Sequence, residues 1–158
     1  KPHMAEGARI MSLQDPTQKM SKTPSTGSGQ TGDEYIALVD FPDQVREKIK
    51  KAVTDSGKEI IFDQDKKPAI SNLITIYHLL SQDGIKDIEE KYTGKSYVEF
   101  KNDLAEVVVN FLKPFQEKRK ELSEDPVFVE DTLSESEEKA RHIAQQTLSE
   151  VKNKMGLY

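Results

Sequence analysis

The sequence contains no cysteine among its 158 residues. Disulfide bridges and metal sites with thiolate ligands are therefore excluded. No apolar run approaches the roughly 20 residues that a membrane-spanning helix needs, so we expect no membrane segment. The chain begins with Lys1 rather than an initiator methionine, and residues 1–7 contain no apolar segment. We therefore expect no signal peptide, and a cytoplasmic protein.

An excess of positive charge is also absent, because 23 Lys and Arg stand against 28 Asp and Glu and the net charge is −5. This balance argues against a protein that binds nucleic acid over its whole surface, so any contact with RNA must be local. The sequence contains two basic clusters interleaved with acidic residues. Each cluster fits either such a local RNA contact or a solvated helix face with i,i+4 charge pairs. The first consists of Arg46, Lys48, Lys50 and Lys51, and the second of Lys113, Lys118, Arg119 and Lys120.

What the sequence does contain is helical periodicity. With 35% hydrophobic and 32% charged residues, it is typical of one domain with much solvated surface. Apolar spacing predicts helices over residues 42–54, from 69 to about 83, 85–92, 100–122 with a kink at Pro114, and 140–155. Residues 8–13 read as a short strand that leads into a turn, and residues 59–63 as a strand or an extended connection. The fold class is therefore mainly α.

A glycine-rich segment over residues 27–32 has the outer glycine spacing of a phosphate-binding P-loop. The chemistry does not fit, because Asp33 stands where that loop needs its lysine and Glu34 where it needs a hydroxyl. Two acidic side chains there would repel a triphosphate. Because residues 23–33 have no apolar side chain that could be buried, we expect them to be the least ordered internal segment.

The segment that carries chemistry is K-M-S-K-T, which covers residues 19–23. It resembles the KMSKS signature of class I aminoacyl-tRNA synthetases, with Thr23 in place of the last serine. The preceding A-R-I-M-S-L-Q-D-P-T-Q, residues 8–18, is similar to the strand and turn before this signature in tryptophanyl-tRNA synthetases. Residues 48–56, 68–73, 92–95, 100–101 and 104–105 are similar to the same family in order and spacing.

The resemblance implies an enzyme that activates tryptophan with ATP, together with Mg²⁺, and transfers it to tRNA(Trp). It implies catalytic roles for Lys19 and Lys22, and ATP contacts from the same two lysines, Met20 and Ser21. Residues 1–39 would be the strand and loop remnant of a Rossmann-type catalytic domain. Residues 40–158 would be a helical anticodon-binding region, and the intact enzyme would be a homodimer.

Flexible lysines have a physical use in such a loop. When an amino-acid carboxylate attacks the α-phosphate of ATP, negative charge grows on the departing pyrophosphate, and ammonium groups that close on it stabilise the transition state. Lys19 and Lys22 are the residues that we expect to act in this way.

A second part of such an active site is missing from the sequence. Class I synthetases need an HIGH-type segment, and none of His3, His78 and His142 lies in one. No histidine has metal-ligand spacing to a carboxylate, so we predict no metal site. We expect the chain alone not to form an aminoacyl-adenylate. Two alternatives remain: a fragment of a tyrosyl-tRNA synthetase, which the A-V-T-D-S and I-S-N-L segments disfavour, and a non-catalytic helical module that binds tRNA or another protein.

Overall fold

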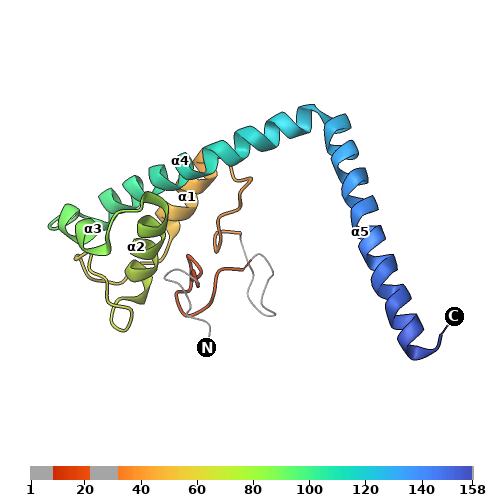
Figure 1. The fold of residues 1–158 in the computed structure, drawn as a ribbon. Helices are drawn as coiled ribbons and strands as arrows, with labels where there is room; N and C mark the ends of the chain where they lie inside the picture. The colour runs from red at the N-terminus through yellow and green to blue at the C-terminus, as the bar shows by residue number, and fades with distance from the viewer. Residues whose placement is uncertain (1–8, 22–31, 158) are drawn as a thin grey trace. The chain divides into compact units, whose positions relative to one another are not determined.

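A computed structural model describes residues 9–21 and 32–157, and it confirms the mainly α fold (Figure 1). The described residues form five helices: α1 (Pro42–Lys51), α2 (Pro68–Ser81), α3 (Ile85–Lys91), α4 (Tyr97–Glu124) and α5 (Pro126–Met155). The chain divides into two compact units, Lys1–Pro114 and Phe115–Tyr158. No helix in the described part of the chain combines the length and the apolar character needed to cross a membrane.

The strand predicted over residues 8–13 is reduced to a single pair of residues. Met11 and Lys19 form an isolated antiparallel β-bridge, and no longer strand occurs in the described ranges. The turn at Asp15 and Pro16, only a few residues from Met11 and Lys19, limits the ladder on that side. Residues 59–63 are the extended connection that the sequence left open.

Helix α1 begins and ends on side-chain contacts that fix its length. Pro42 occupies the first turn, where its missing N–H costs nothing, and the Phe41 N–H donates to the Gln44 side chain at 2.8 Å. At the other end, Lys101 from α4 donates to the carbonyl oxygen of Ala52 at 2.7 Å. Burial lowers the pKa of Lys101. Because this cap closes the last turn, α1 ends at Lys51, before the predicted residue 54.

Helix α2 lies at the centre of the first unit. Six consecutive residues, Ala69 to Ile74, are buried, so the helix is covered on more than one side, as its dense apolar pattern predicts. It ends at Gln82, whose backbone is left-handed with φ of 66°. Tyr77 near its C-terminal end packs against Tyr92 and Phe100, with ring centroids 5.9 Å away in both cases.

Helix α4 contributes the other half of that core. It starts with a capping box, in which the Glu99 carboxylate accepts from the Ser96 N–H at 2.8 Å. Its buried stripe follows helical spacing: Phe100, Leu104, Ala105, Val108 and Leu112. The apolar spacing over residues 100–122 also predicts Phe111 on this buried face, and that prediction is wrong, because Phe111 is 41% exposed.

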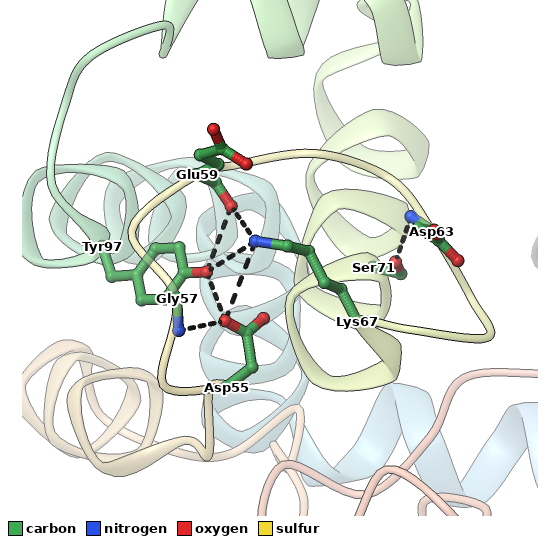
Figure 2. Close-up of polar contacts among 7 residues, drawn as sticks. All are labelled: Asp55, Gly57, Glu59, Asp63, Lys67, Ser71 and Tyr97. Carbon is green, nitrogen blue, oxygen red and sulfur yellow. Dashed lines mark hydrogen bonds and ion pairs between the residues drawn. The ribbon is translucent and has the colours of Figure 1, made fainter.

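The connection between α1 and α2 is fixed by a polar network around Tyr97, at the start of α4 (Figure 2). The Tyr97 hydroxyl donates to the Asp55 carboxylate at 2.7 Å, which also accepts from the Gly57 N–H at 2.7 Å. Lys67 donates to the Glu59 carbonyl oxygen at 2.9 Å. Burial, and then the contact with Asp55, raise the pKa of Tyr97.

Helix α5, in the second unit, starts fourteen residues before the predicted position 140. Asp125 caps it by accepting from the Phe128 N–H at 3.0 Å, and Pro126 occupies the first turn. It ends at Gly156, the predicted stop, with φ of 71°. No α5 residue is buried, and Ile143, one of its predicted apolar stripe, is 64% exposed.

Candidate functional site

Residues 10–20 form a small hairpin. The Ser12 N–H donates to the Gln18 carbonyl at 2.8 Å, and the Met20 N–H donates to the Ile10 carbonyl at 2.9 Å. These two bonds flank Met11 and Lys19, which makes them a non-hydrogen-bonded pair of the antiparallel type. The Lys19 backbone therefore has a set position at the end of the hairpin.

The turn of this hairpin is closed by Asp15. Its carboxylate accepts from the Thr17 hydroxyl at 2.6 Å, from the Thr17 N–H at 2.9 Å and from the Gln18 side chain at 2.7 Å. The hydrogen bonds from Thr17, followed by the one from Gln18, lower the pKa of Asp15. The Asp15 carboxylate is thus held by hydrogen bonds within the turn.

Lys19 lines an open hollow of about 330 Å³ at the other end of the hairpin. Its side chain is exposed, and its ammonium group forms no ion pair with any residue in ranges 9–21 and 32–157. The described residues that line the hollow include two cations and no carboxylate: Arg9, Ile10, Lys19, Met20, Ser21, Tyr35 and Ile36. Such a lining favours an anion.

One wall of the hollow, Tyr35 and Ile36, is fixed by a nearly buried ion pair. Lys48 of α1 approaches the Asp40 carboxylate to 2.6 Å, and only 13% and 11% of these side chains are exposed. The same carboxylate accepts from the Ala37 N–H at 2.8 Å, and the Lys48 ammonium lies 5.0 Å from the centroid of the Tyr35 ring. The first helix thereby fixes the segment opposite Lys19.

The predicted site residues are only partly described. Lys19, Met20 and Ser21 come together at the hollow, whereas Lys22 and most of the predicted mobile segment lie outside the described residues. The sequence reading missed Arg9. A hairpin centred on Asp15 places residue 9 opposite residue 21, so the turn alone contained a signal for it.

Most residues of the two basic clusters have acidic partners. Arg46 binds Glu106 at 2.7 Å and Asp43 at 2.9 Å, and these contacts raise its pKa. In the same cluster Lys51 pairs with Asp33 at 3.3 Å. In the second cluster, Lys118 and Lys120 pair with Glu121 and Glu124. The i,i+4 and neighbouring charge pairs that the sequence left as one alternative are therefore present.

A family profile described as "tRNA synthetases class I (W and Y)" matches residues 2–113, which include the hairpin, the hollow and the core of helices α1 to α4. The chain belongs to this family of class I tRNA synthetases. The resemblance inferred from the K-M-S-K segment is thus confirmed.

Within that family, the similar proteins include tryptophan–tRNA ligases. The chain is 45% identical over 157 residues to tryptophan–tRNA ligase 2 of Streptomyces avermitilis, covering 99% of this chain and 45% of the relative. It is 49% identical over 151 residues to tryptophan–tRNA ligase of Bacillus subtilis, covering 96% and 44%. The chain thus spans less than half the length of these curated relatives.

Solved structures agree. The tryptophanyl-tRNA synthetase of Mycoplasma pneumoniae matches with a TM-score of 0.79 at 32% identity, over 98% of this chain and 45% of that one. The enzyme of Campylobacter jejuni, solved as a complex with ADP and tryptophan, matches with a TM-score of 0.70 at 28% identity, over 97% of this chain and 45% of that one.

Proposed function

We propose that this chain is the C-terminal part of a tryptophan–tRNA ligase, in which the whole enzyme activates tryptophan with ATP and transfers it to tRNA(Trp). The observation that supports this most is the position of Lys19. Among the described residues it is an exposed lysine without an ion pair, in a hollow that no described carboxylate lines, within a chain whose family profile covers residues 2–113. The relatives described above favour tryptophan over tyrosine as the amino acid.

In the proposed reaction, Lys19 and Lys22 act on charge that develops as the bond to pyrophosphate breaks. An ammonium group stabilises the leaving oxygens most when their charge is greatest, so the lysines lower the barrier rather than anchor the substrate. Arg9 lines the same hollow and adds a further positive charge. Met20 and Ser21 border the nucleotide, and the hairpin prevents the Lys19 backbone from drifting.

Magnesium would enter this reaction with ATP as part of the substrate. In the part of the chain that the structure describes, no carboxylate lines the hollow and no group of three His, Cys, Asp or Glu residues could bind a metal ion. The described residues therefore do not fit a protein-bound Mg²⁺, and the contribution of this chain is the positive charge of its own side chains.

The remaining parts of the proposal concern partners. Residues 40–158 would bind the tRNA anticodon region, residues 1–39 would complete the catalytic domain, and the intact enzyme would act as a cytoplasmic homodimer. The acidic partners of Arg46, Lys51, Lys118 and Lys120 leave little unpaired positive charge on these clusters. Contact with tRNA would then rely on shape and on a few local charges, rather than on a broad basic face.

The test is pre-steady-state formation of tryptophanyl-adenylate by the full-length enzyme with Lys19→Ala or Lys22→Ala. If each lysine supplies one charge-assisted contact in the transition state, each substitution removes about 2 to 4 kcal/mol, or roughly tens to a thousandfold in rate. The dissociation constant for tryptophan should barely change, because the loop does not touch the indole.

Lys50→Ala is the matched control, since Lys50 is an exposed lysine on α1 that does not line the hollow. It should leave adenylate formation unchanged. Wild-type rates in both Lys19→Ala and Lys22→Ala would refute the assignment of this loop. The non-catalytic alternative would then be favoured.

A further inference from the structure

We infer that Asn72, on helix α2, is a positioning residue that sets the placement of Lys19 through the backbone of Met11. This inference rests on the proposed function of Lys19. Asn72 is far from the signature segment in sequence and does not line the hollow around Lys19. Its effect on the reaction would therefore pass through the hairpin.

The Asn72 side chain makes two hydrogen bonds to one residue. Its carbonyl oxygen accepts from the Met11 N–H, and its amide nitrogen donates to the Met11 carbonyl, both at 2.9 Å. In an antiparallel pair without direct hydrogen bonds, the N–H and C=O of each residue point away from the partner strand. Met11 is such a residue, so the groups it turns away from Lys19 are those that Asn72 binds. Asn72 thus takes the place of a third strand.

The residue type at this position suits the task. An amide side chain carries one acceptor and one donor in a plane, which matches the N–H and C=O of a strand edge. Aspartate has no donor for the carbonyl, and a hydroxyl cannot reach both groups at once. Asn72 is 7% exposed, and Ile70 and Leu73 beside it are fully or almost fully buried. The two hydrogen bonds to Met11 are therefore made by a residue of the buried core and not by an exposed side chain.

The hydrogen bonds of Asn72 would affect how precisely Lys19 is placed. The backbone of Lys19 lies directly across from Met11, so a shift of Met11 would move the ammonium group relative to a bound phosphate. A displacement of about 1 Å in a catalytic group is enough to cost a large rate factor. Loss of Asn72 should slow adenylate formation while leaving tryptophan affinity intact.

Ser71 provides a matched control on the same helix turn. It is 1% exposed, and its hydroxyl accepts from the Asp63 N–H at 2.9 Å, in the connection between α1 and α2 (Figure 2). Ser71→Ala removes a buried side-chain contact to the backbone, as Asn72→Ala does, but the contact is with Asp63 and not with a hairpin residue. A loss due only to reduced stability would appear in both variants.

The experiment compares tryptophanyl-adenylate formation in the full-length enzyme with Asn72→Ala, Ser71→Ala, Lys19→Ala and the double variant Asn72→Ala/Lys19→Ala, below the unfolding temperature of each. We expect Asn72→Ala to slow the step about tenfold or more, and Ser71→Ala to change it less than about twofold. In the Lys19→Ala background, Asn72→Ala should add less than about twofold, because residues that act through one group are non-additive. If Asn72→Ala does not fold, Asn72→Ser supplies the same comparison.

Three results would count against the inference. A normal rate for Asn72→Ala with a slowed Lys19→Ala refutes the role of Asn72 and leaves the proposed function standing. An equal slowing by Asn72→Ala in both backgrounds also refutes it, since Asn72 would then not act through Lys19. A wild-type rate for Lys19→Ala refutes the proposed function, and the inference with it.

Discussion

At the scale of single residues, two ion pairs made by basic side chains of α1 differ in how deeply they are buried. Lys48 and Asp40 are paired with only 13% and 11% of their side chains exposed, and the pair fixes one wall of the hollow. Arg46 and Asp43 are paired with 44% and 94% exposed. Water screens the second pair, and Arg46 retains Glu106 if Asp43 is lost. The two aspartates should therefore differ in what they contribute.

We expect Asp40→Ala to lower the free energy of unfolding of this chain by about 2 to 5 kcal/mol, because it leaves the Lys48 ammonium almost buried and unpaired. Asp43→Ala should lower it by less than about 1 kcal/mol. Urea denaturation of both variants provides the measurement. Equal losses would mean that burial does not set the value of these pairs.

At the scale of elements, the helices were the part of the fold that the sequence could predict. Apolar spacing located α2 and the buried stripe of α4, because a helix covered by a core repeats its apolar residues every three to four positions. Bounds were less accurate where contacts outside the pattern set them. Lys101 ends α1 early, and the Asp125 cap starts α5 well before its apolar residues begin.

The candidate site was predictable only as far as its motif and the turn before it extend. Lys19, Met20 and Ser21 are adjacent in sequence, so one segment identifies them. Tyr35 reaches the hollow because Lys48 and Asp40 fix its segment, and Asn72 reaches Met11 because α2 packs in the core. Neither contact leaves a periodic signal in the sequence, since each depends on how distant elements pack.

The packing of α4 can be tested at Leu104, which is 0% exposed on the stripe that faces the core. Leu104→Ala should lower the free energy of unfolding by about 2 to 5 kcal/mol through lost burial and the cavity that remains. Val98→Ala, on the same helix at 66% exposure, should change it by less than about 0.5 kcal/mol. Denaturant midpoints of the two variants measure the difference, and a small loss at Leu104 would show that the core does not depend on this stripe.

At the scale of the whole molecule, the buried apolar residues belong to the first unit. The core cluster extends from Leu13 to Leu112, and α5 contributes no buried residue. Hydrophobic stabilisation is roughly proportional to the apolar area removed from water. The stability of this chain should therefore come from the part that ends with α4.

Removing residues 125–158 should accordingly change the free energy of unfolding of the remaining chain by less than about 1 kcal/mol. A chain that ends at Glu106 is the control, because it also loses Val108 and Leu112 from the core and should be destabilised by several times as much. Urea denaturation of both truncated chains tests this expectation. A large loss in the first would mean that α5 supports the core.

The bond between Asn72 and Met11 also has a consequence for the order in which the protein is made. Its two ends are 61 residues apart in the chain. At a synthesis rate of about 5 to 20 residues per second, Asn72 is added to the chain roughly 3 to 12 s after Met11. During that time Met11 has no partner on its outer edge. The lysine segment is thus synthesised early in this chain and is fixed in place only after Asn72 of α2 has been translated.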